Sequence, residues 1–261
     1  MIRRQIAFEC AGARLYGALD LPAGAPGATG LLIVSGGNEI RSGAWNGQAL
    51  LAARLAGEGV AVLRFDRRGV GESDGENRGF RESGPDIAAA VSTFRREVPE
   101  LRRVIGFGNC DAASALMLGQ GCGLDGLILS NPWTIESEDA PPPPAALRAH
   151  YARRLTDPAA LWRLLRGKVS LGGLARSLRD LGRTARPTSL AGDMARGLAG
   201  FPGRADILLA GRDRTAQAFR SHWPAADPRV STFADASHSY VEPDAQEWLA
   251  GRILAFIREA D

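Results

Sequence analysis

The sequence predicts an α/β fold in which a mostly parallel sheet carries helices on both faces. Short apolar runs of strand length alternate with stretches of helical spacing along residues 31–133. The apolar runs are almost continuous, which is typical of parallel strands that are buried on both faces. A glycine-rich or polar turn follows each run, and in such sheets the loops beyond the carboxyl ends of the strands form the binding sites.

The expected elements follow one another in a regular order. Residues 4–21 alternate apolar and polar side chains and are broken by two glycines, a pattern that predicts an antiparallel hairpin. Further strands are expected at the apolar runs within residues 31–37, 60–66, 102–108 and 124–133. Helices are expected between these strands, at residues 45–58, 85–97 and 111–119.

The pattern changes after residue 133. Residues 134–203 contain four consecutive prolines and amphipathic stretches rich in Arg and Leu, and they show no strand pattern. We interpret 134–203 as a helical insertion over the sheet, which divides the core into residues 1–133 and 204–261. The sheet is expected to resume at residues 205–211 and to end with a helix at 244–259.

Composition excludes several classes of protein. The net charge is only +3 and the arginines are scattered, so we expect no nucleic-acid partner. Three irregularly spaced cysteines form neither a disulfide framework nor a zinc-binding spacing, which predicts a cytoplasmic protein without a metal or other cofactor. No stretch approaches the roughly 20 apolar residues that cross a bilayer, and the N-terminus lacks the features of a signal peptide, so no membrane insertion is expected.

The stretch GNCDA places a cysteine between an apolar strand and a helix. This is the pattern of a nucleophile elbow, in which the nucleophile lies on a sharp turn flanked by small residues. Gly108 and Ala112 are the small residues here, and Cys110 is the nucleophile. A thiol at a helix N-terminus is favoured as thiolate. The alternative is that Cys110 is a small buried core residue, which is common for free cysteine.

The second half of the sequence supplies partners for this cysteine. Asp213 follows the apolar run at 205–211, and His238 follows the last apolar run. His238 would accept the thiol proton and Asp213 would orient its ring, so we predict a Cys110–Asp213–His238 triad. The oxyanion would be bound by the backbone N–H of Asp111 and by Gly37 or Asn38, which lie in the glycine turn after the first core strand.

Three further residues are candidates for substrate binding. Arg41 follows the oxyanion turn and could bind a carboxylate or phosphate, or could be a solvated arginine. Trp45 and Trp133 lie at a loop and a strand end, where aromatic rings line pockets, although either could belong to the core. The Asp111 side chain could disfavour the thiolate or cap the elbow helix, and the sequence leaves both interpretations open.

Five stretches together resemble one family over nearly the whole chain. SGGN, FDRRGVGESDG, GNCDA, GRD and ASHS are similar to the corresponding motifs of α/β-hydrolases. RFDRRGVGESDGENRGF, GNCDAASALM and LILSNPW, followed by an Arg-rich insertion, resemble in particular the hydrolases associated with bacterial exosortase A systems, which are encoded beside exopolysaccharide and protein-sorting genes. The elbow cysteine is also similar to that of dienelactone hydrolases.

The resemblance implies the α/β-hydrolase fold with a helical cap insertion. It also implies a cysteine-dependent esterase or thioesterase that acts through an acyl-enzyme on a small-molecule or carrier-linked acyl substrate. Two alternatives remain at this point: an acyltransferase to a sugar or carrier, and a non-catalytic binding protein with the hydrolase fold. The sequence names neither the acyl group nor the oligomeric state.

Overall fold

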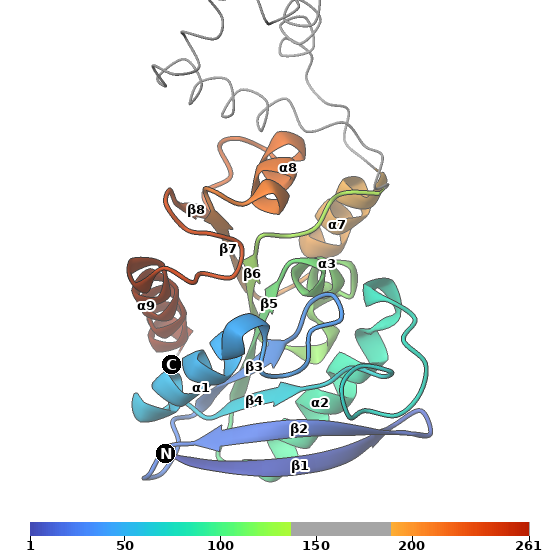
Figure 1. Cartoon of the computed structure of the whole chain (residues 1–261), viewed down its shortest axis with the longest axis vertical. Coiled ribbons are helices and arrows are strands. Elements are labelled where there is room, and N and C mark those ends of the chain that lie inside the picture. The colour runs from blue at the N-terminus through green and yellow to red at the C-terminus, as the bar shows by residue number, and fades with distance from the viewer. Residues whose placement is uncertain (137–188, 261) are drawn as a thin grey trace, which may run out of the picture.

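The computed structural model describes residues 1–136 and 189–260, and in this part of the chain the strands form a single eight-stranded sheet (Figure 1). The strand order is β1-β2-β4-β3-β5-β6-β7-β8. The β1–β2 and β2–β4 pairs are antiparallel, and all other pairs are parallel. The strands are β1 (Ile2–Cys10), β2 (Ala13–Leu21), β3 (Thr29–Val34), β4 (Val62–Phe65), β5 (Arg103–Asn109), β6 (Gly126–Ser130), β7 (Arg204–Ala210) and β8 (Val230–Phe233).

Helices cover both faces of the sheet. The first group packs on one face and consists of α1 (Gly47–Gly57) and α9 (Pro243–Ala260). The second group packs on the other face and consists of α2 (Gly84–Glu97), α3 (Asp111–Leu118), α7 (Ser189–Ala199) and α8 (Arg214–His222). Three short 3-10 helices lie in loops, at η1 (Ala44–Asn46), η2 (Phe80–Glu82) and η3 (Gln120–Gly123). The predicted mostly parallel sheet with helices on both faces is confirmed.

The central strand β3 shows why the apolar runs are continuous. Leu31 and Ile33 pack into the core under α1 and α9, whereas Leu32 and Val34 pack into the core on the opposite face. All four side chains are completely buried. Because successive side chains of a strand point to opposite faces, a strand buried on both sides must be apolar at every position.

Helix α7 lies inside the predicted insertion, yet it packs with the core. Leu190, Met194 and Leu198 are buried in the same cluster as the residues of α2 and α3. A Cβ at Gly197 would lie 2.2 Å from the backbone oxygen of Met117, so glycine at this position lets α7 approach α3 closely. We therefore place 189–203 with the core; the rest of the predicted 134–203 insertion, residues 137–188, lies outside the described residues.

The two described ends of this region meet at Glu136. Its carboxylate accepts a hydrogen bond of 2.6 Å from the backbone N–H of Leu190 and another from the hydroxyl of Ser189. These two bonds lower the pKa of Glu136. A carboxylate at a helix N-terminus also interacts favourably with the helix dipole, so the chain is tied to the start of α7 at the point where the described part resumes. Within the described residues, no helix has both the length and the apolarity that crossing a membrane requires.

The packing of α7 predicts the effect of truncating its buried face. Met194 is completely buried. Met194→Ala is expected to lower the free energy of unfolding by about 2–5 kcal/mol, because the substitution removes buried surface and leaves a cavity. Arg196→Ala on the exposed side of the same helix should change it by no more than about 0.5 kcal/mol. Urea denaturation checks both values, and equal small effects would contradict the assignment of α7 to the core.

Candidate active site

The candidate nucleophile lies on a strained turn between β5 and α3. Cys110 has φ 62° and ψ −128°, a backbone conformation that residues with a side chain rarely adopt. A Cβ at Gly108 would lie 2.8 Å from backbone atoms of Ala112 and Ala113, so the turn requires glycine there. Ala112 is completely buried, which explains why a small residue follows the cysteine at that distance. The local backbone has the features of a nucleophile elbow.

His238 and Asp213 lie beside this turn. The Nδ1 atom of His238 is 2.9 Å from an Asp213 carboxylate oxygen, and the imidazole also lies beside the Cys110 side chain, close enough for the two to interact electrostatically. Asp213 follows β7 and is nearly buried, and its two carboxylate oxygens accept the backbone N–H groups of Thr215 (3.2 Å) and Ala216 (3.0 Å) at the start of α8. Because the helix end fixes both oxygens, Asp213 presents a rigid acceptor to the imidazole.

The electrostatics of this group favour a charged imidazole. Contact with Asp213, followed by contact with Cys110, raises the pKa of His238 to about 10, although partial burial acts in the opposite direction. The other two cysteines have the reverse environment. Burial raises the pKa of Cys122 to about 11, and burial together with a hydrogen bond to Asp86 raises the pKa of Cys10. Among the described residues, only the Cys110 thiol lies beside an imidazole whose pKa is raised.

A buried amide holds in place the loop between β8 and α9, which carries His238 and is called the histidine loop below. Asn131 directly follows β6, is completely buried and has a positive φ of 43°. Its side-chain nitrogen donates to the Asn109 side chain (2.9 Å) and to the backbone oxygen of His238 (3.2 Å), and its oxygen accepts the N–H of Ala210 (2.8 Å). The Asn109 side chain donates to the same His238 oxygen at 3.2 Å. Two amides therefore fix the backbone from which the imidazole projects.

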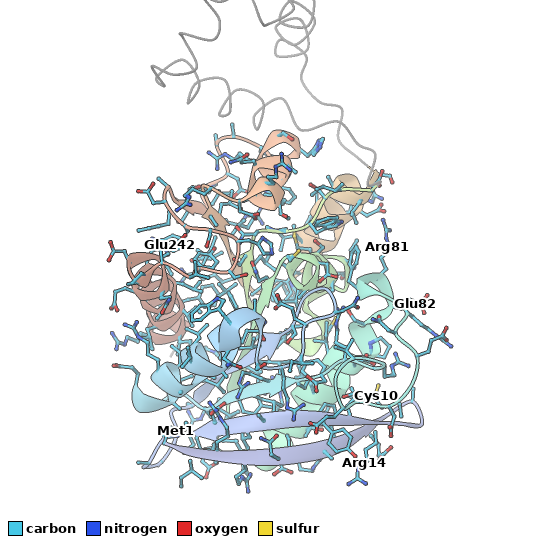
Figure 2. The ribbon with its side chains drawn as sticks, in the orientation of Figure 1. Met1, Cys10, Arg14, Arg81, Glu82 and Glu242 are labelled. Carbon is cyan, nitrogen blue, oxygen red and sulfur yellow. The ribbon has the colours of Figure 1, made fainter. Side chains whose placement is uncertain are left out.

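Glu242 supports the same loop from its other side. One carboxylate oxygen accepts both the backbone N–H and the hydroxyl of Ser237, each at 3.0 Å, and the other oxygen pairs with Arg212 at 3.3 Å. Figure 2 shows Glu242 just before α9, at the end of the histidine loop. These bonds lower the pKa of Glu242, chiefly through the Ser237 backbone, so it stays ionised and keeps accepting both donors.

The predicted oxyanion turn lies against the elbow. A Cβ at Gly36 would lie 2.5 Å from the backbone oxygen of Asn109 and 3.4 Å from Cβ of Cys110, so glycine is needed for this approach. Asp111 is the first residue of α3, and its backbone N–H has no intrahelical partner. The Asp111 side chain does not cap α3; its carboxylate instead accepts the N–H of Gly37 at 2.6 Å.

The remaining predicted residues lie in different surroundings. The Asn38 side chain accepts a hydrogen bond of 2.8 Å from Asn77. The Arg41 guanidinium forms ion pairs with Asp66 and Glu72, so it is not the free substrate-binding cation that the sequence suggested. Both carboxylates come from the loop after β4, which the position of Arg41 in the sequence could not indicate.

The two candidate tryptophans lie in different surroundings: Trp45 lines a pocket, whereas Trp133 is half-buried. Trp45 is 40% exposed, and its indole N–H donates to the backbone oxygen of Ser239 at 3.1 Å. Trp133 packs against the core, and its backbone N–H donates to the Cys110 oxygen at 3.3 Å. Its own indole N–H is satisfied by the backbone oxygen of Ile135 at 2.7 Å.

A cavity of about 110 Å³ lies between α1, α9 and the end of β5. Asn109, which precedes the candidate nucleophile, and Ser239, which follows His238, both line it. The rest of its wall is mainly apolar. The main apolar side chains are those of Trp45, Leu50, Leu51, Phe107 and Leu249. The cavity is thus adjacent to two members of the predicted triad and suited to an apolar group.

Comparison with known proteins agrees with this geometry. The model of the alpha/beta hydrolase family matches residues 31–252, which is most of the chain. The chain belongs to the alpha/beta hydrolase family. No curated protein sequence matches this hydrolase.

Solved structures show the same fold at low sequence identity. The alpha/beta hydrolase GrgF from Penicillium sp. sh18 is 17% identical, with a TM-score of 0.66 and 99% of each chain covered. The esterase Pf2001 from Pyrococcus furiosus is 16% identical, with a TM-score of 0.62, covering 99% of this chain and 91% of its own. Est1E from Butyrivibrio proteoclasticus, solved with bound ferulic acid, is 17% identical, with a TM-score of 0.61, covering 97% of this chain and 98% of its own. The family match supports a hydrolase class for the protein, and these neighbours show the same fold.

Sequence reasoning missed the residues that hold the site of this hydrolase together. Asn131 lies in the NPW stretch directly after a predicted strand, and that position was the only signal of its role. Glu242 and Asn109 gave no signal of their own, because each contacts a backbone group of the histidine loop, and no sequence pattern records such a contact.

The raised pKa of His238 predicts a specific titration. In the wild type the His238 imidazole should titrate far above its usual value of 6.5, near pH 10. Asp213→Asn removes the largest cause of the shift, so the pKa should fall towards the usual range. NMR of the imidazole C–H signals measures this. His222, whose pKa is lowered by burial, serves as an internal control that should not move.

The same shift has a consequence for stability. A pKa raised in the folded state contributes stability that is complete below pH 6.5 and is lost as the pH rises towards 10. This pH dependence should disappear in Asp213→Asn, as measured by thermal unfolding across that range. An unchanged profile would contradict the Asp213 contact as the cause.

Proposed function

We propose that the protein is a cysteine-dependent hydrolase that cleaves an ester or thioester through an acyl-enzyme on Cys110. The observation that carries this proposal is the group of three side chains: a thiol on a strained elbow, an imidazole beside it, and a buried carboxylate 2.9 Å from the imidazole. Family membership supports hydrolase chemistry, and esterases of known structure are similar in fold. The association with exopolysaccharide and protein-sorting systems rests on the sequence motifs alone.

The first half of the reaction transfers the acyl group to sulfur. The Cys110 thiolate attacks the carbonyl carbon, and the carbonyl oxygen takes up the negative charge as the C–S bond forms. The backbone N–H of Asp111 at the start of α3 is the first donor to this oxyanion. When the tetrahedral intermediate collapses, the bond to the leaving group breaks, and the His238 imidazolium gives its proton to the departing alkoxide or thiolate.

The second half of the reaction needs His238 as a neutral base, so the pKa of its imidazole must fall. Contact with Cys110 is the second cause of the raised pKa of His238, and acylation converts the thiolate into a neutral thioester. The pKa of His238 therefore falls in the acyl-enzyme, which makes the neutral ring available as a base. It removes a proton from water, the hydroxide adds to the thioester carbonyl, and the C–S bond breaks to release the carboxylic acid and restore the thiolate–imidazolium pair.

The test is intact-mass spectrometry after brief exposure to p-nitrophenyl acetate. One acetyl adduct is expected on the wild type and none on Cys110→Ala. His238→Ala should form it about 10²–10⁴-fold more slowly, because the thiolate loses its partner. Cys10→Ala and Cys122→Ala are matched controls that remove a thiol with a raised pKa and should keep the adduct.

Two results would overturn the proposal. One is a wild type that forms no adduct at Cys110, and the other is an adduct that survives in Cys110→Ala. Decay of the adduct in water alone, compared with decay after addition of an alcohol or thiol, separates a hydrolase from an acyltransferase.

The cavity adjacent to the triad extends the proposal to the apolar part of the substrate. We assign it to a short acyl chain, because its main side chains are apolar and its volume is about 110 Å³. Burying each methylene group contributes about 0.8 kcal/mol, which corresponds to roughly a fourfold rise in kcat/KM per added carbon until the cavity is full.

A series of p-nitrophenyl esters of increasing chain length checks this assignment. Leu51→Trp fills the cavity, so the rise with chain length should vanish while the rate with the acetate ester stays within about twofold. Glu58→Trp, at the exposed end of the same helix, is the control and should keep the wild-type series. A Leu51→Trp series identical to that of the wild type would place the acyl chain elsewhere.

A further inference from the structure

The Asp111 carboxylate accepts a hydrogen bond from one of the N–H groups that the sequence offered as donors to the oxyanion. Gly37 N–H donates to Oδ1 of Asp111 at 2.6 Å. A Cβ at Gly36 would lie 2.9 Å from that same oxygen and 3.4 Å from Cβ of Cys110. The carboxylate oxygen therefore lies against the turn that faces the nucleophile, where the carbonyl oxygen of a bound ester would accumulate negative charge.

A second, independent observation comes from the other side of the turn. Arg67, in the loop after β4, is only 4% exposed, and one of its terminal nitrogens donates to the backbone oxygen of Gly37. The same nitrogen, Nη2, is 4.0 Å from the second oxygen of Asp111. The other terminal nitrogen, Nη1, is buried and has no hydrogen-bond partner among the described residues. A buried cationic donor without an acceptor is unfavourable, so a carboxylate that reached this nitrogen would be stabilised there.

We propose that Asp111 and Arg67 are a pair of positioning residues that operate the oxyanion site. In the free enzyme the Asp111 carboxylate masks Gly37 N–H. When substrate binds, its carbonyl oxygen takes that N–H, and the carboxylate moves onto the Arg67 guanidinium. This inference rests on the proposed function, and it adds two residues that the Cys110–Asp213–His238 group does not include.

The charges explain why the two residues act together. A carboxylate left beside Gly37 would repel both the thiolate and the oxyanion, which carry the same sign. When the carboxylate moves to Arg67, it forms an ion pair that balances its charge and gives the buried Nη1 an acceptor. Throughout, Arg67 keeps its bond to the Gly37 oxygen. It thus holds the turn in place while the N–H of Gly37 changes partner. The movement is small, because the guanidinium already lies 4.0 Å away.

The alternative is a static tether, in which Asp111 simply ties the oxyanion turn to the elbow. The two cases predict opposite signs for the same substitution. A tether predicts that Asp111→Ala loosens the turn and weakens oxyanion binding. The proposed pair predicts that Asp111→Ala removes a competitor and strengthens it.

The experiment measures inhibition by butanal. The Cys110 thiolate adds to its carbonyl carbon, and its oxygen enters the oxyanion site. Protonation of that oxygen gives a hemithioacetal. If the masked state accounts for about nine in ten free molecules, Asp111→Ala should lower the inhibition constant about tenfold. Arg67→Met leaves the carboxylate without a cation to move to, so the constant should rise by about tenfold or more. Arg67→Lys, which keeps the charge, should recover part of the loss.

The double variant decides between the two cases. Adding Asp111→Ala to Arg67→Met should relieve most of the Arg67→Met defect, because no carboxylate is then left to displace. A static tether predicts that the double variant is at least as impaired as either single variant. Glu76→Ala, which removes an exposed carboxylate of the same loop, is the control and should match the wild type.

A second readout covers the case in which the Arg67 variants do not fold. In the wild type the amide proton of Gly37 should resonate far downfield because of its short bond to a carboxylate, and it should shift on addition of butanal and in Asp111→Ala. An Asp111→Ala inhibition constant equal to or above that of the wild type would overturn the inference. Acetylation of Cys110 by p-nitrophenyl acetate in the same preparation shows whether the proposed function itself still stands.

Discussion

The arrangement of the candidate active site depends on one buried amide more than on any of the three side chains proposed to react. Asn131 connects the ends of three strands, because its side chain binds Asn109 at the end of β5 and the backbone N–H of Ala210 at the end of β7, while it follows β6 itself. It also donates to the backbone of His238. Loss of the Asn131 side chain would therefore disturb Asn109, the end of β7 and the loop that carries His238 at the same time. Such a fully satisfied buried network specifies one arrangement in a way that apolar packing does not.

Opposite charges lie beside one another in the candidate site. The Asp213 carboxylate lies beside the His238 imidazole, and the Asp111 carboxylate lies near the guanidinium of Arg67. Because each of these carboxylates has a cationic neighbour, a partly buried region can hold them without large unfavourable interactions. Two backbone N–H groups at the start of α8 fix Asp213, whereas Asp111 accepts the N–H of Gly37 and is the carboxylate that changes partner in the proposed pair.

The sequence allowed us to predict that three candidate residues lie together, but not which residues surround them. Cys110, Asp213 and His238 were expected at one edge because each follows an apolar strand, and parallel strands bring their carboxyl ends to one edge. The contact of Gly37 with Asp111 joins residues 74 positions apart, and no local pattern records it. Arg41 looks the same in sequence whether it meets a substrate or Asp66. The amphipathic pattern of helix α7 indicates a buried face but does not indicate what packs against it. The sequence alone therefore places α7 in the insertion.

The contact of Glu136 with the start of α7 gives the fold a modular character. The described chain stops at 136 and resumes at 189, and a hydrogen bond joins these two positions. The two described stretches therefore meet at one point of the core. For a loop whose ends are held together, each doubling of length costs only about 0.6 kcal/mol of closure entropy. A change in the number of residues between these two positions is therefore expected to leave the sheet, and the candidate site at its edge, in place.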